Sequence, residues 1–148
     1  MRRRALAAIL ALACIAALGG VPLLASAHLN DVSADAQISA NGTVVAETAY
    51  VAADAWLAVY ADDDGSRGEL LGIRRLDGAG FRTDVPVAID DAAWRQWDEG
   101  EARTIHVALH EDGGGGFDRD EDPILSSFGR AATDSLVLGR GATAYVGA

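Results

Sequence analysis

Three histidines are the residues of this sequence whose chemistry is easiest to name, and that chemistry is copper binding. His28 directly follows Ala25-Ser26-Ala27, the small-x-small pattern that signal peptidase cleaves. As a new N-terminus, His28 would offer its α-amine and its imidazole together, a pair of nitrogen ligands that Cu²⁺ favours. A second histidine, His106 or His110, would complete the site. Those two stand four residues apart on one predicted strand, roughly 13 Å, so at most one of them joins His28.

An acidic loop is the second candidate, and its spacing points to calcium. Asp118, Asp120 and Asp122 stand at i, i+2 and i+4, as at the start of an EF-hand loop, and Asp112 precedes them. Ca²⁺ takes about six to eight oxygen ligands. Pro123 occupies the place of the usual glycine and no bidentate glutamate follows, so the ligand pattern is incomplete. The alternative is a solvated loop in which glycines 113–116 make a wide turn.

Enzyme motifs are missing from the sequence that follows residue 27. Its only cysteine, Cys14, precedes that point, and no G-x-S-x-G pattern is present. Ser126-Ser127 has no histidine near it in sequence. The glycine run 113–116 is not followed by Lys-Ser/Thr and is flanked by carboxylates, which excludes a phosphate loop. We therefore expect a protein that is not an enzyme.

Residues 1–27 are predicted to be a secretory signal peptide. Arg2, Arg3 and Arg4 precede an apolar run, and glycines and a proline interrupt that run before it reaches the length of a membrane span. An uncleaved anchor is the alternative. Residues 28–148 then form one domain that is secreted or otherwise extracytoplasmic, with no membrane insertion after cleavage.

The charge of that domain excludes some partners. All 22 acidic residues but only 9 of the 12 basic ones follow residue 27, and none of the basic ones is lysine. The net charge of −13 repels nucleic acid and anionic lipid. Such a surface suits high salt, where screening weakens self-repulsion. The Asp-rich, lysine-free composition resembles that of halophilic proteins, although GC-rich genomes also favour Arg over Lys.

Short apolar stretches separated by Asp and Gly predict the fold. Strands are expected over 44–51, 56–60, 70–75, 81–89, 103–110, 135–138 and 143–146, with another at 28–33 or 36–39. Phe81, Thr83, Val85, Val87 and Ile89 should share one face of their strand. Pro86 cannot donate to a ladder, so that strand should lie at an edge. About seven strands at this spacing predict an immunoglobulin-like antiparallel β-sandwich.

One helical turn is expected after the strand 81–89. Asp90 can cap it, and Trp94 and Trp97 fall three residues apart on its surface. The two rings are either a lid over the open end of the sandwich or an exposed platform for carbohydrate. Trp56 is expected in the core.

The order of these motifs resembles a known family. NGTVV, AWLAVYADDDG, GELLG, FRTDVPVAID, IHVALHED, FDRDEDP and TDSLVL follow one another between Asp35 and Val146. This is similar to the uncharacterised all-β domain of secreted and cell-surface proteins of haloarchaea and some bacteria. The resemblance implies an immunoglobulin-like sandwich outside the cytoplasm and implies no activity. In such proteins the loop often reads D-x-N-x-N-G-x-F-D, whereas glycines 113–116 replace most of those oxygen-bearing positions here.

The sequence thus supports three hypotheses about function. The first is an exported, acidic, non-enzymatic β-sandwich that acts as a surface or interaction module with a protein partner at the cell surface. The second is an extracytoplasmic copper protein that uses His28 with His106 or His110. The third is a domain stabilised by Ca²⁺ through the loop from Asp118 to Asp122, with Asp112 nearby.

Overall fold

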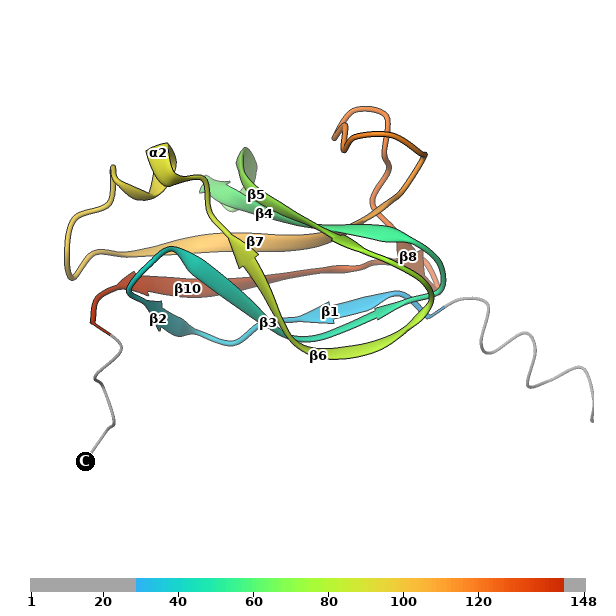
Figure 1. The fold of residues 1–148 in the computed structure, drawn as a ribbon, viewed down its shortest axis with the longest axis horizontal. Helices are drawn as coiled ribbons and strands as arrows, with labels where there is room; N and C mark the ends of the chain where they lie inside the picture. The colour runs from blue at the N-terminus through green and yellow to red at the C-terminus, as the bar shows by residue number, and fades with distance from the viewer. Residues whose placement is uncertain (1–28, 143–148) are drawn as a thin grey trace, which may run out of the picture.

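The computed structural model describes residues 29–142, and this part of the chain is all-β with one short helix. Two main sheets of three and five strands pack face to face, as in a β-sandwich, and a two-stranded hairpin accompanies them (Figure 1). The elements are β1 Asp31–Ser33, β2 Gln37–Ser39, β3 Thr43–Val51, β4 Ala55–Asp63, β5 Ser66–Leu76, β6 Gly80–Ala88, α2 Asp91–Trp94, β7 Ala102–Glu111, β8 Ser126–Ser127, β9 Arg130–Ala131 and β10 Thr133–Arg140.

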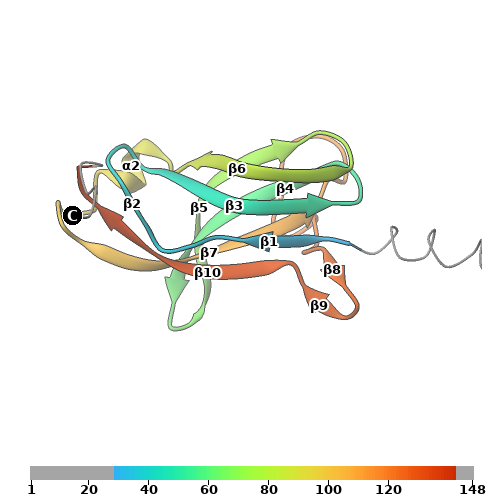
Figure 2. The same cartoon turned by 90° about the horizontal axis from the view of Figure 1, so that it is seen from below.

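The first two strands belong to different sheets. The three-stranded sheet has the order β1-β3-β6, and the five-stranded sheet has the order β2-β10-β7-β4-β5. β1 pairs with β3 antiparallel, whereas β2 pairs with β10 in parallel, with Gln37 opposite Leu138. The segment from β1 to β2 therefore crosses from one sheet to the other along their shared side (Figure 2).

The core lies between the sheets and follows the period-two pattern of the strands. In β7, Ile105, Val107 and Leu109 are fully buried, and the inward residues of β3, β4 and β10 meet them. The buried apolar cluster between the sheets consists mainly of Val32, Val44, Ala46, Ala49, Val51, Leu57, Val59, Leu71, Leu76, Val85, Val87, Ile89, Trp94, Trp97, Ile105, Val107, Leu109, Leu136 and Leu138.

β6 lies at an edge, as Pro86 predicts, since its sheet partner is β3 alone. The prediction for its faces is correct for Val85, Val87 and Ile89, which are buried, and wrong for Phe81 and Thr83, which are exposed. The reason is Asp84, whose φ of 52° interrupts the extended backbone between the two halves of the strand. A left-handed residue shifts the alternation of side chains, and Asp tolerates that conformation better than most residues.

β5 passes close to the end of β6, on the other side of the sandwich from the β1–β2 segment. A Cβ at Gly72 would overlap the carbonyl oxygen of Ala88, so this crossing requires glycine. Asp90 then donates its backbone N–H to the Leu71 carbonyl (2.7 Å). Its side chain accepts from the N–H groups of Ala92 and Ala93, which confirms the predicted N-cap of α2.

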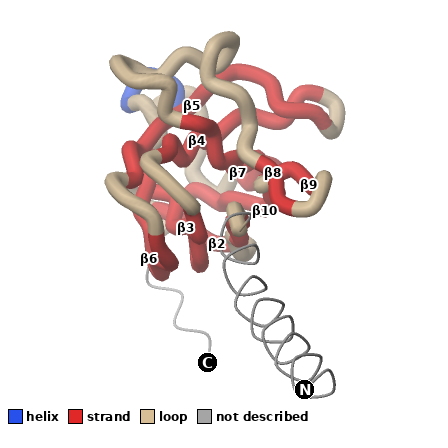
Figure 3. Tube along the Cα trace, turned by 90° about the vertical axis from the view of Figure 1, so that its right-hand side faces the viewer, coloured by secondary structure: helices blue, strands red, loops and turns tan. Residues whose placement is uncertain are grey.

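The helix α2 lies at one side of the described body, which within residues 29–142 consists otherwise of strands and loops (Figure 3). No helix within residues 29–142 has the length and apolar character that crossing a membrane requires. The strand expected over 143–146 and the signal peptide expected over 1–27 lie outside the described residues.

Candidate functional site

A second, smaller core lies on the outer face of the five-stranded sheet. Ala58, Tyr60 and Ala108 are buried there although their side chains point away from the sandwich interior. Phe117 and Ile124 cover them, and both come from the segment between β7 and β8. The acidic loop of residues 112–123 is therefore attached to the sheet, although its glycines 113–116 are exposed, as expected for a solvated wide turn. It rises above the sheet in orange in Figure 1.

His110 joins this loop to the sheet. Its exposed fraction is 3%. Its Nδ1 lies 2.7 Å from the Asp122 carbonyl oxygen, and its Nε2 lies 2.7 Å from the Tyr60 hydroxyl. A carbonyl can only accept, so Nδ1 carries the proton and Nε2 accepts from Tyr60. Burial lowers the pKa of His110, because it disfavours the charged imidazolium.

Asp122 organises the loop itself. Its carboxylate accepts the backbone N–H of Asp118 (2.9 Å) and that of Gly113 (3.2 Å), and the residue is buried. A Cβ at Gly113 would lie 2.9 Å from Asp122 Oδ1, so a larger residue there would push against the carboxylate that joins the two ends of the loop. Asp118 Oδ1 accepts the N–H of Asp120 (2.9 Å). Two of the three carboxylates proposed for Ca²⁺ are thus bonded to the loop backbone.

Asp112 is fixed at the start of the loop. Its carboxylate accepts from the Gly114 backbone N–H and from Arg75 Nε, both at 2.9 Å, and these two bonds lower its pKa. Arg75 also forms ion pairs with Asp54 and Asp77. A buried carboxylate with two charge-assisted bonds is held firmly, and the first residue of the loop is thereby fastened to β5.

Aromatic contacts complete the attachment of the loop. The Phe117 ring packs against Trp56 (6.0 Å between centroids) and edge-on against His110 (5.0 Å). The Arg119 guanidinium lies 4.7 Å from the centre of the Tyr60 ring. Trp56 is therefore half-buried beneath the loop on the outer face, and the expectation that it lies in the sandwich core is wrong. It shares that face with His110, its partner across β4 and β7.

His106 lies on the same outer face but outside this cluster. Its Nε2 is 2.6 Å from Asp62 Oδ1, and this hydrogen bond is the main cause of the lowered pKa of Asp62. Both predicted histidine ligands thus have partners within the protein. Within residues 29–142, no group of three or more His, Asp or Glu side chains is placed to hold a metal ion. His28 lies outside the described residues, so the copper hypothesis stays a prediction.

The two tryptophans of the helical turn belong to the core. Trp94 and Trp97 are 6% and 4% exposed, and their ring centroids lie 5.1 Å apart. Arg140 Nη1 donates to the carbonyl oxygens of both residues. The prediction of a lid over the end of the sandwich is confirmed, and with both rings buried there is no exposed pair on which a sugar could stack.

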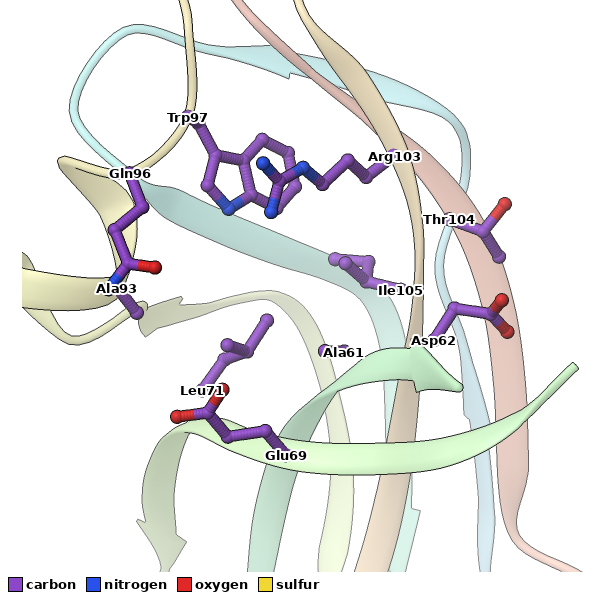
Figure 4. Close-up of a pocket in the computed structure, with 10 residues that line it drawn as sticks. All are labelled: Ala61, Asp62, Glu69, Leu71, Ala93, Gln96, Trp97, Arg103, Thr104 and Ile105. Atoms are coloured by element: carbon purple, nitrogen blue, oxygen red, sulfur yellow. The ribbon is translucent and has the colours of Figure 1, made fainter. Parts of the chain in front are cut away.

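A hollow of about 300 Å³ lies beside this lid, bordered by α2, β4, β5 and β7. Trp97 and Arg103 stand on one side of it, and Leu71 and Glu69 stand on the opposite side (Figure 4). Ile105 lies between the two sides. Arg103 stacks on Trp97 with its Cζ 4.7 Å from the ring centroid. The hollow combines an apolar floor with charges of both signs.

No local pattern in the sequence marks Arg103 or Glu69 as site residues. Arg103 and Glu69 come from different strands, and only the pairing of β4 with both β5 and β7 brings them to one hollow. Phe117 was also missed, although one aromatic residue within a run of glycine and acidic residues is a signal that the loop packs against something.

Comparisons with known proteins identify a family but no activity. No curated protein and no solved structure gives a significant match to the chain. The model of one family, described as Domain of unknown function (DUF7282), matches residues 30–137. Since this match covers the sandwich from β1 into β10, the chain belongs to that family.

Proposed function

We propose that this protein is an exported, non-catalytic binding module of the cell surface. One observation carries the proposal: the side chains best suited to catalysis or metal binding form hydrogen bonds that stabilise the fold. His110, Asp112 and Asp122 fasten the acidic loop to the sheet, and His106 is paired with Asp62. A catalytic group must reach its substrate, whereas these groups bond to neighbours in the same chain.

We further propose that the sandwich is immunoglobulin-like. Constant-type immunoglobulin folds place the first, second, fourth and fifth principal strands in one sheet and the third, sixth and seventh in the other. With β1 and β2 taken as two halves of the first strand, the orders β1-β3-β6 and β2-β10-β7-β4-β5 follow that arrangement for all but the fourth strand, β5, which joins the second sheet. Such sandwiches commonly serve as scaffolds for binding surfaces in extracellular proteins.

Export is the second part of the proposal, and it rests on the sequence. The basic start, the apolar run and Ala25-Ser26-Ala27 have the order of a secretory leader. The strongly acidic, lysine-free sequence that follows suits a protein exposed to concentrated salt. The family resemblance described above supports the same location in halophilic organisms.

The two metal hypotheses are alternatives to this proposal. A copper site would need His28 as the mature N-terminus. Cu²⁺ would also have to bind Nδ1 of His106, whose Nε2 is bonded to Asp62, or displace a partner of His110, whose two ring nitrogens are both bonded. A Ca²⁺ site would have to draw Asp122 away from two backbone N–H groups. Each displacement costs hydrogen bonds, so the binding-module proposal needs fewer changes to the fold.

Expression of the full chain with a C-terminal tag tests the proposal. We expect the mature protein in the envelope or medium, with an intact mass that starts at His28, and saturable retention of the purified protein on washed cell envelopes. The Ala27→Arg variant, which spoils the cleavage site, should keep its leader. A chain that stays in the cytoplasm with residues 1–27 attached, or that shows no saturable retention, would contradict the proposal.

A further inference from the structure

The hollow beside the tryptophan lid contains polar groups that the fold leaves without partners. In the part of the chain that the structure describes, the Glu69 carboxylate and the Gln96 amide make no hydrogen bond or ion pair, and both line this hollow. His110, Asp112 and Asp122, by contrast, are bonded within the chain. Uncommitted polar groups around an apolar floor are typical of a small-molecule site.

Two contacts orient Arg103, the cation that lines the hollow. Arg103 donates from Nε to Glu101 (2.6 Å) and stacks on the Trp97 ring. Glu101 in turn accepts the Asp98 backbone N–H (2.7 Å). Within residues 29–142, the two terminal nitrogens of Arg103 have no acceptor. A stacked guanidinium with its two outer N–H groups open is prepared for bidentate binding of a carboxylate.

Glu69 provides the opposite charge on the other side. It projects from β5 next to Leu71, across the hollow from Arg103 (Figure 4). The apolar surface between them comes from Leu71, which is 5% exposed, and from the half-buried Ala61 and Ala93. A ligand that fits this arrangement has a carboxylate at one end, an ammonium group at the other and an apolar body between or beside them.

We propose that this hollow binds a small zwitterion of the amino-acid type. Arg103 receives the carboxylate, Glu69 receives the ammonium group, and the apolar side chain lies over Leu71 and Ala61. The volume of about 300 Å³ is at the low end for ligand pockets, which suits one amino acid better than a larger metabolite. This assignment rests on the proposed function, because it names the ligand class of a non-catalytic binding module.

Three probes with the same apolar body separate the contributions. L-leucine carries both charges, 4-methylpentanoate carries the carboxylate alone, and 3-methylbutylamine carries the ammonium group alone. We expect saturable binding of leucine to the purified protein in calorimetry, with shifts of the Trp97 indole N–H in a ¹⁵N spectrum. Each single-charge probe should bind about tenfold more weakly, the loss of one ion pair.

Variants assign the two charges. Glu69→Gln should weaken leucine about tenfold and leave 4-methylpentanoate unchanged, since that probe has no ammonium group. Arg103→Gln should weaken leucine and 4-methylpentanoate equally. Arg103→Lys should restore part of the affinity for both, because it keeps the charge and loses the bidentate geometry. Arg130→Gln, in β9 and outside the hollow, is the matched control and should bind leucine as the unaltered protein does.

Two outcomes would overturn the assignment. One is no saturable leucine binding, and the other is equal binding of the three probes by Glu69→Gln and by the unaltered protein. Export and retention on envelopes are measured without leucine, so a failure here is distinguishable from a failure of the proposed function. If the Arg103→Gln protein does not fold, the Glu69→Gln variant, which changes an exposed residue, still tests the assignment.

Discussion

His110 lies at the centre of the contacts between the acidic loop and the sheet, and each of its ring nitrogens has one partner. Nδ1–H donates a hydrogen bond to the Asp122 carbonyl, and in the neutral state Nε2 accepts one from the Tyr60 hydroxyl. A second proton on Nε2 would point at the Tyr60 oxygen and break that hydrogen bond. Arg67 and Arg119 lie near enough to disfavour a further positive charge, although Asp122 opposes them. Protonation therefore weakens the attachment of the loop.

We predict that the protein loses stability as the pH falls below about 6.5. The folded state holds the pKa of His110 below its value in the unfolded chain, so between these two values the unfolded chain binds more protons. Stability is complete above this window and decreases as the pH falls through it, by at most about 1.4 kcal/mol per pH unit. Melting temperatures measured between about pH 7.5 and 5.5 test this.

The same scan on two variants assigns the effect. His110→Gln should remove most of the slope, and His106→Gln, whose histidine lies outside the cluster, should keep it. An unchanged slope in His110→Gln would show that another group causes the dependence.

At the scale of elements, the acidic loop is a folded cap. Asp122 closes it through two backbone N–H groups, Asp112 fastens its start, and Phe117 anchors its middle. The ligand spacing that predicts calcium is also the spacing that lets side-chain oxygens accept nearby backbone N–H groups. The same acidic residues can therefore either bind Ca²⁺ or accept hydrogen bonds from the loop backbone, and their spacing in the sequence does not distinguish these two roles.

Asp122→Ala should release this cap. Removing a buried acceptor of two backbone N–H groups should cost roughly 1–3 kcal/mol of unfolding free energy. Limited proteolysis should then cut within residues 112–123 faster than in the unaltered protein. Asp120→Ala, an exposed residue of the same loop, should change stability by less than about 0.5 kcal/mol. Equal protease resistance in Asp122→Ala and in the unaltered protein would contradict this description of the loop.

The crossing of β5 over the end of β6 provides a second test. Gly72→Ala forces a Cβ into the Ala88 carbonyl, so the strands must separate, and we expect a loss of about 1–3 kcal/mol. Gly116→Ala is the control, because a Cβ there has open space around it. Chemical denaturation measures both variants, and a Gly72→Ala protein as stable as the Gly116→Ala protein would show that the crossing is looser than described.

Local patterns in the sequence predict much of the fold but little of the hollow. Alternating apolar residues give the strands, Pro86 gives an edge, and Asp90 gives the helix start. Phe81 is assigned to the wrong face because period two cannot anticipate the φ of Asp84. The pairing of Arg103 with Glu69 across the hollow depends on strand order, which is a property of the whole sheet.

At the scale of the whole molecule, net negative charge dominates. The chain carries −10 in total, and its carboxylates include close like-charged neighbours. Asp35 and then Asp84 raise the pKa of Glu47, because each disfavours a further negative charge beside it. Such repulsion falls when salt shortens the range of the electrostatic interaction to about 3 Å at 1 M.

We therefore predict that the melting temperature rises with NaCl between low salt and about 1 M, because screening reduces the repulsion. CaCl₂ and MgCl₂ at equal ionic strength should raise it by equal amounts, since Asp122 is bonded to the loop backbone. Calorimetry at constant pH gives both comparisons. A larger rise with CaCl₂ than with MgCl₂ would favour the calcium hypothesis for Asp118, Asp120 and Asp122.

The parallel pairing of β2 with β10 affects how the chain folds during its synthesis. β2 has a neighbouring strand in its sheet only once β10 is present, because Gln37 pairs with Leu138, about a hundred residues later. Closing so large a loop early is entropically costly, and contacts of this kind slow folding. During synthesis the sandwich cannot be completed until its last strand has emerged, so we expect the chain to reach its full fold only when nearly all of it has been made.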